Sequence, residues 1–142
     1  ETIILPNVIL SKLVTHANNS KPYESVALIA GKIQGSIAFA EKAYTPRNIE
    51  QSTVSFSVEP LELLEIYTDI ENEKLELVAI FHTHPAPPTP SGTDLYYMEV
   101  NTCIWLISNT AEPEKPHGFL LLEDGSLKKI KIEITNNKPN LV

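Results

Sequence analysis

The sequence predicts an α/β fold in which one mixed β-sheet is combined with helices. Short apolar runs of strand length alternate with segments whose apolar residues recur at helical spacing, and glycine-containing turns join some strands into hairpins. The chain of 142 residues is 42% hydrophobic and 20% charged, which is the size and composition of a single globular domain with its own core. We expect this domain to span residues 1–135 and residues 136–142 to form a loose tail.

The first third of the chain predicts a strand, a helix and a hairpin. Thr2–Leu5 is expected to be a short edge strand, and Pro6 suits the first turn of a helix. Val26–Ala30 is an apolar run typical of a buried strand, and Gly31 and Gly35 bracket the predicted turn into a second strand. The helix between them is indicated by apolar residues at helical spacing, namely Ile9, Leu10, Leu13, Val14 and Ala17.

The middle of the chain predicts a strand, an acidic helix and a central strand. Alternation over Val54–Val58 indicates a short strand, and Glu59-Pro60 opens the helix. Leu77–Phe81 then has the length and composition of a buried strand. The helix is expected to have an apolar face of Leu63, Leu64, Tyr67 and Ile70 and a solvated face of Glu62, Glu65, Asp69 and Glu73.

The last third predicts a helix, a strand and a closing hairpin. The helix is expected at about residues 91–101, and the strand lies around Trp105. Asp124-Gly125 is a strong turn signal between the two strands of the hairpin. In its second strand, Leu127–Ile134, a change in the apolar phase near Lys128 indicates a β-bulge.

Charge and cysteine content limit the possible partners and the compartment. The formal net charge is −7, which argues against nucleic acid or an anionic membrane as the main partner, since both need a basic surface. No apolar run approaches the ~20 residues of a membrane span. The single cysteine, Cys103, lies in an apolar strand pattern and rules out an internal disulfide. A reducing compartment, and therefore the cytoplasm, is expected.

Two histidines follow the predicted central strand, two residues apart. Residues i and i+2 of a strand point to the same side, so the imidazoles of His82 and His84 can reach one metal ion. Asp94, ten residues beyond His84, offers a hard oxygen as a third ligand. Two histidines and one carboxylate leave a tetrahedral position open, which is typical of catalytic zinc. Non-haem iron oxygenases use the same ligand set, so the residues alone leave the metal open.

The loop between these ligands is stiff and ends in a predicted helix cap. Its four prolines between residues 85 and 90 fix φ and reduce the entropy that is lost when the loop is ordered. Ser91 is a candidate N-cap, and Asp94 lies in the first helical turn, where the helix dipole favours an acidic residue. This structural interpretation is compatible with ligation, because a cap fixes the helix that carries the ligand.

The compound pattern resembles the His-x-His…Ser-x-x-Asp motif of the JAMM (MPN-plus, Mov34-type) zinc metalloproteases. The matching residues are His82-Thr83-His84-Pro85 and Pro90-Ser91-Gly92-Thr93-Asp94, and Glu24 occupies the place of the family's upstream glutamate. The resemblance covers roughly residues 6–108. The sequence departs from the family motif at two places. Six residues separate His84 from Ser91, one fewer than the family spacing, and Ser25 stands where many prokaryotic relatives have a cysteine.

The resemblance implies a minimal, archaeal-like member of that family with a curved sheet of the cytidine deaminase-like architecture. It implies one Zn²⁺ per chain on His82, His84 and Asp94, with Glu24 as general base and Ser91 as donor to the oxyanion. The implied reaction is hydrolysis of the amide bond after the C-terminal tail of ubiquitin or a ubiquitin-like protein. Such a tail is expected to add as a strand beside an exposed sheet edge near the site.

Two other functions remain open at this point. The same site suits a hydrolase that trims a sulfur-carrier protein or a peptide in cysteine or cofactor biosynthesis. A non-catalytic scaffold of the same family is the third alternative, against which the intact Glu24, His82, His84, Ser91 and Asp94 count. The oligomeric state is open as well, with a homodimer among the alternatives.

Overall fold

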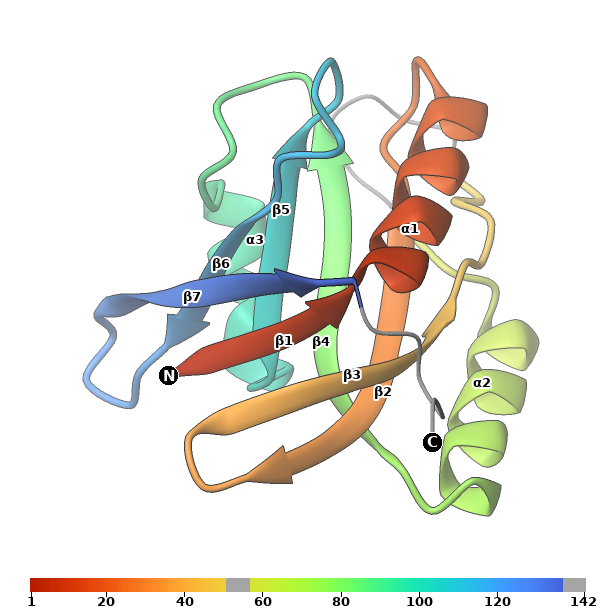
Figure 1. The fold of residues 1–142 in the computed structure, drawn as a ribbon. Helices are drawn as coiled ribbons and strands as arrows, with labels where there is room; N and C mark the ends of the chain where they lie inside the picture. Colours follow the sequence, from red (N-terminus) through yellow and green to blue (C-terminus); the bar gives the residue numbers. More distant parts are fainter. Residues whose placement is uncertain (51–56, 137–142) are drawn as a thin grey trace.

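The computed structural model describes residues 1–50 and 57–136, which form three helices and seven strands (Figure 1). Most of the predicted strand Val54–Val58 lies outside the described residues, and its last two residues are not in a strand. Except for Asn136, the predicted tail also lies outside them. The elements are β1 (Thr2–Pro6), α1 (Asn7–Ser20), β2 (Val26–Gln34), β3 (Ile37–Tyr44), α2 (Pro60–Asn72), β4 (Glu76–His84), α3 (Gly92–Val100), β5 (Ile104–Asn109), β6 (His117–Leu121) and β7 (Leu127–Thr135).

The seven strands form one mixed sheet that closes into a barrel in the order β1-β3-β2-β4-β5-β6-β7. Strand β1 runs parallel to β3 and β7, and β4 runs parallel to β5. The remaining neighbours are antiparallel. The prediction of an α/β domain with a mixed sheet is therefore confirmed, and closure of the sheet is the feature that the sequence did not indicate.

The expectation that β1 is an edge strand is wrong. Residues Thr2–Pro6 pair with Lys131–Thr135 of β7 on one side, and Thr2–Ile4 pair with β3 on the other. Both neighbours come from distant parts of the chain, so a local pattern gives no sign of them. Every strand in the described chain pairs on both sides over at least part of its length, but Ser108 and Asn109 at the end of β5 pair with β4 alone. The expected addition of a substrate strand beside the site therefore stays a prediction.

The β2–β3 hairpin is longer than predicted, because Gly31 lies inside the strand rather than at the turn. The pairing of β2 with β3 shifts register between Ala30 and Gly31, and a Cβ at Gly31 would lie 1.8 Å from the carbonyl oxygen of Phe39. Gly35, at a φ of 62°, is the glycine that makes the turn. In the second hairpin Gly125 has a φ of 87°, and β6 pairs with β7 in continuous register, so the predicted bulge near Lys128 is absent.

The helices cover both sides of the central strands, as Figure 1 shows for α1 in front of the sheet and α3 behind β5. Helix α1 packs through Ile9 and Leu13 into the cluster that contains Ala27 and Ile29 of β2. The opposite side of β2 packs on α2 and α3. No helix in the described residues is long and apolar enough to cross a membrane.

The predicted apolar face of α2 is confirmed in part. Ile66 and Ile70 are buried against Leu28 and Ala30 of β2, whereas Leu64 is 61% exposed and Tyr67 is 39% exposed. Ile70 is buried and Leu63 is packed against the same cluster, as predicted, so the expectation is wrong for Leu64 and Tyr67 only. Leu64 lies two residues from Ile66 and so turns away from the buried face. Glu59 caps this helix by accepting a hydrogen bond from the Glu62 amide over 2.9 Å.

Candidate metal centre

His82 and His84 lie at the carboxyl end of β4, in the middle of the sheet. Their side chains alternate with Thr83, so both imidazoles leave the strand on the side covered by α3. His82 is fully buried and His84 nearly so. The Trp105 ring of the neighbouring β5 packs edge-on against His82, with ring centroids 5.8 Å apart. The central strand therefore holds the two histidines that are candidate metal ligands in a buried site.

Asp94 and Ser91 form a capping box at the start of α3. The Ser91 amide donates to Asp94 Oδ2 over 2.9 Å, and the Asp94 amide donates to Ser91 Oγ over 3.0 Å. The predicted cap is therefore confirmed. The second carboxylate oxygen, Asp94 Oδ1, lies 3.0 Å from His82 Nε2. One carboxylate thus caps the helix with one oxygen and faces a histidine with the other.

Four of the five candidate residues come together in one buried cluster. Asp94 Oδ2 lies 3.8 Å from His84 Nε2, and Glu24 Oε1 lies 3.6 Å from His82 Nδ1. The two imidazole centroids are 5.4 Å apart. Ser91 is exposed and adjoins the cluster through its bonds with Asp94. The structure thus places Ser91 at the rim of the site.

The two carboxylates dominate the electrostatics of the cluster. Burial lowers the pKa of His82, but its contacts with Asp94 and Glu24 outweigh burial and raise that pKa to about 9. For Asp94, burial raises the pKa, while His82 and the bonds to Ser91 bring it below the ordinary value of an aspartate. Two buried carboxyl groups beside one imidazole form a site that favours a bound cation.

The donor set fits a divalent ion of borderline softness. Ligand atoms about 2.0–2.1 Å from a tetrahedral zinc lie about 3.3 Å from one another. The distances from Asp94 to the two Nε2 atoms, 3.0 and 3.8 Å, bracket that separation. In the described part of the chain, no group of three His, Cys, Asp or Glu side chains is already arranged around an ion. Binding therefore requires adjustment of side chains that are already neighbours.

The proline-rich loop is braced by the last residue of β5 and the residue after it. The Asn109 side chain donates to the Ala86 carbonyl over 3.0 Å, and the Thr110 amide donates to the His84 carbonyl over 3.0 Å. Within the loop, the Thr89 carbonyl lies 3.2 Å from His84 Nε2. The role of Asn109 was not predictable from the sequence, because β5 becomes a neighbour of this loop only when it pairs with β4.

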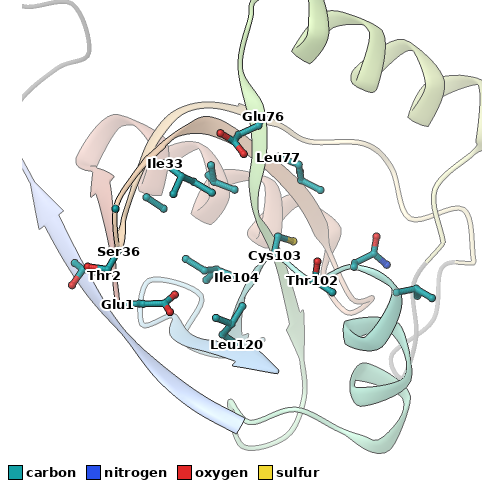
Figure 2. Close-up of a pocket in the computed structure, with 15 residues that line it drawn as sticks. Glu1, Thr2, Ile33, Ser36, Glu76, Leu77, Thr102, Cys103, Ile104 and Leu120 are labelled. Atoms are coloured by element: carbon teal, nitrogen blue, oxygen red, sulfur yellow. The ribbon is translucent and has the colours of Figure 1, made fainter. Parts of the chain in front are cut away.

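Two of the cavities among the described residues lie at different distances from the site. One, of about 230 Å³, is an apolar groove between α2 and α3 whose lining includes Val26, Tyr67 and Trp105. The other, of about 460 Å³, is shown in Figure 2 with Glu1, Glu76 and Cys103 around it. Val78, which also lines this second cavity, lies four residues before His82 on β4, so the cavity is about 13 Å or more along the strand from the candidate ligands.

Fold and site together define a small α/β domain with a buried histidine–histidine–carboxylate cluster at the end of its central strand. The family model described as prokaryotic homologs of the JAB domain matches residues 6–120, and the chain belongs to that family. The resemblance to the JAMM/MPN family is thereby confirmed.

Named relatives and a solved structure agree with this assignment. The chain is 33% identical over 134 residues to the desampylase of Pyrococcus furiosus, covering 94% of this chain and 91% of the relative. It is 30% identical over 95 residues to a probable TtuB-protein conjugate cleaving protease of Thermus thermophilus, covering 66% of this chain and 61% of the relative. The solution structure of a Desulfitobacterium hafniense protein superposes with a TM-score of 0.83 at 29% identity, covering 96% of this chain and 95% of the other.

Proposed function

We propose that this chain is a zinc-dependent isopeptidase that hydrolyses the amide bond after the C-terminal tail of ubiquitin or a ubiquitin-like modifier. The observation that carries the proposal is the burial of Glu24, His82, His84 and Asp94 in one cluster. The Thermus relative is named as a protease of TtuB-protein conjugates, which supports protein conjugates as the substrate class. The lone, half-buried Cys103 supports a place in the reducing cytoplasm.

His82, His84 and Asp94 would hold the zinc ion. When bound, the ion supplies Lewis-acid chemistry, which polarises the substrate carbonyl and makes water more acidic. The ligand atoms facing each other are Nε2 of both histidines and the two carboxylate oxygens of Asp94. Since Asp94 also caps α3, the capping box sets the orientation of the ligand and limits its rotation.

Glu24 would take a proton from the attacking water and deliver it to the leaving amine. Its Oε1 lies 3.6 Å from His82 Nδ1, which is longer than an ordinary hydrogen bond. The contact nevertheless gives Glu24 a second possible duty, the orientation of the His82 ring. The two duties differ in their consequences, because loss of a general base lowers turnover, whereas loss of an orienting carboxylate weakens zinc binding.

Ser91 would stabilise the oxyanion that forms during attack. Its Oγ accepts a hydrogen bond from the Asp94 amide, so its own hydroxyl hydrogen remains available to donate. The side chain is exposed at the rim of the buried cluster, where a substrate carbonyl can approach it. Removal of one such donor typically costs about 100- to 1,000-fold in kcat.

The apolar groove between α2 and α3 would receive apolar side chains of the modifier. It opens beside Val26, which pairs with His82 across the sheet, and beside Trp105, which packs on the His82 ring. Tyr67 and Tyr97 stand partly exposed along it. The acidic residues of α2 and the net charge of −7 favour a modifier whose approaching surface is basic.

The test is a zinc titration of metal-free protein followed by addition of a conjugate of a ubiquitin-like protein. Trp105, the only tryptophan, lies against His82 and should report binding through a fluorescence change that saturates at one zinc per chain. Cleavage should appear with zinc, disappear with a chelator and return when zinc is restored. His82→Ala should lose both the fluorescence response and cleavage, whereas Asn7→Asp on the exposed face of α1 should lose neither. A chelator-resistant cleavage would contradict the proposal.

A further inference from the structure

Glu24 lies outside the regular hydrogen-bond ladder of the sheet, although a general base must be placed accurately relative to the water that it deprotonates. Strand β2 begins at Val26, so neither Glu24 nor Ser25 belongs to it. The direction of the Glu24 carboxylate relative to His82 follows from the backbone at residue 24. Groups other than the strand pairing must therefore fix this backbone.

The peptide group that joins Glu24 to Ser25 is held at both edges by buried side chains. Asn48 Nδ2 donates to the Glu24 carbonyl oxygen over 3.0 Å, and the Ser25 amide donates to Thr83 Oγ1 over 3.1 Å. The C=O and N–H of a trans peptide point in opposite directions, so the two bonds hold its plane from opposite sides. We call Asn48 and Thr83 the peptide clamp. Both are buried, so water does not readily substitute for either bond.

Each member of the clamp is anchored in its turn. Asn48 Oδ1 accepts hydrogen bonds from the amides of Glu50 and Ser57, over 3.1 and 3.0 Å. Thr83 lies between the two histidines of β4, and its own amide donates to the Ser25 carbonyl over 3.2 Å. The Thr83 and Ser25 hydroxyls share a further bond of 3.0 Å. The clamp thus joins the Glu24 peptide directly to the strand that carries His82 and His84.

We infer that Asn48 and Thr83 are positioning residues that hold the Glu24 carboxylate where it transfers a proton, an inference that rests on the proposed function. The clamp acts through the backbone of Glu24 and touches neither substrate nor metal. A displacement of about 1 Å in a reacting group is enough to cost about 100-fold in rate. Loss of the clamp therefore lowers kcat while the fold, the bound zinc and the KM for the conjugate are kept.

Three substitutions distinguish the contributions of the two hydrogen bonds of the clamp. Asn48→Asp keeps an acceptor for the Glu50 and Ser57 amides but loses the donor to the Glu24 carbonyl. Thr83→Val removes Oγ1 with little change in shape, and Thr83→Ser restores the hydroxyl. We expect Asn48→Asp and Thr83→Val to lower kcat by about 10- to 100-fold, with KM within about twofold, and Thr83→Ser to stay near wild type.

Matched controls make the same chemical changes away from the site. Asn7→Asp in α1 and Thr68→Val in α2 alter exposed residues that bond to Asn136 and to the Leu64 carbonyl. Both should leave kcat unchanged. Zinc content and the thermal unfolding midpoint are measured for every variant. If kcat falls only as far as the folded or zinc-bound fraction falls, Asn48 and Thr83 are merely structural and the inference is wrong.

Hydrogen exchange at the Ser25 amide tests the clamp without any catalysis. In zinc-free wild-type protein this amide should be protected, and Thr83→Val and Asn48→Asp should speed its exchange, whereas Thr83→Ser and the two controls should not. Unchanged exchange in Thr83→Val, or unchanged kcat in both clamp variants, would overturn the inference. Failure of the proposed function gives a different result: the wild-type protein then cleaves no conjugate. Exchange of the Ser25 amide still shows in that case whether the clamp holds the Glu24–Ser25 peptide.

Discussion

At the scale of single residues, the site depends on side chains with two duties each. Asp94 closes the capping box through Oδ2 and faces His82 through Oδ1. Thr83 separates the two histidines along β4 and accepts a hydrogen bond from the Ser25 amide. Such sharing explains how a short segment between residues 82 and 94 can carry most of the cluster.

Cys103 gives a prediction of pH dependence at the same scale. Burial raises the pKa of its thiol to about 12, above the ordinary value of 9.0. At pH 8 the native protein should therefore hold about a thousandfold less thiolate than the unfolded chain, and alkylation by iodoacetamide should be slower by a similar factor. The unfolded thiol loses its proton first, so this group should lower folding stability as the pH rises above 9 toward 12. Equal alkylation rates in native and unfolded protein would contradict the burial of the Cys103 thiol.

At the scale of elements, β4 and its neighbours decide where the chemistry lies. Strand β4 is flanked by β2, which leads in from Glu24, and by β5, which carries Trp105. A register shift between Ile29 and Ala30 in the β2–β4 ladder and another between Ala30 and Gly31 in the β2–β3 ladder bend β2 at one point. Val26 lies opposite His82, so the start of β2 and Glu24 stay near the end of β4 that carries the two histidines.

Gly31→Ala tests the packing at this bend. The added Cβ would meet the Phe39 carbonyl at 1.8 Å, and backbone rather than a flexible side chain would have to move. We expect a loss of about 1–3 kcal/mol or more in the free energy of unfolding, measured by urea denaturation. The matched control is Gly92→Ala, where nothing lies within 4 Å and alanine favours the helix. A Gly31→Ala variant as stable as wild type would mean that the β2–β3 contact is looser than described.

At the scale of the whole molecule, closure of the barrel links the site to global stability. The first and last strands, β1 and β7, pair along Thr2–Pro6, so both ends of the chain help to enclose the core. The two histidines lie on the central strand of that barrel and are buried with it. An ion bound to them would therefore link the proposed site to the stability of the core.

Zinc should accordingly stabilise the entire domain. A ligand that binds only the native state at about 1,000 times its Kd adds about 4 kcal/mol to the free energy of unfolding. We expect the thermal midpoint of metal-free protein to rise on addition of zinc and to stay unchanged with magnesium, which prefers oxygen ligands. His84→Ala should remove most of the rise. An equal response in wild type and His84→Ala would place the bound zinc elsewhere.

The features that were predictable from the sequence are the local ones. The apolar run Leu77–Phe81 with two histidines after it, and Ser91 three residues before Asp94, each specify geometry over a few residues. They led to the strand, the shared face of the imidazoles and the helix cap, all of which the structure shows. The α/β class follows in the same way from apolar spacing.

The features that escaped prediction depend on contacts between distant segments. The second neighbour of β1 lies about 130 residues away along the chain, so Thr2–Leu5 gave no sign of closure. The face of α2 was assigned correctly for Leu63 and Ile70 but not for Leu64, which is as apolar as the buried Ile66, so that only the position of β2 distinguishes the two. Asn48 is a looser match to the family in the sequence, and its bond to the Glu24 carbonyl appears only when two loops meet.

The most direct measurement is the mass of the products from a ubiquitin-like protein with a C-terminal extension, treated with wild-type protein and with Glu24→Gln. We predict one cut after the terminal glycine by the zinc-loaded wild type. We predict at least a 100-fold slower cut by Glu24→Gln at unchanged zinc content, because the general base is gone. If Glu24→Gln cleaves as fast as wild type, Glu24 is not the base. If it loses its zinc instead, Glu24 serves to orient His82.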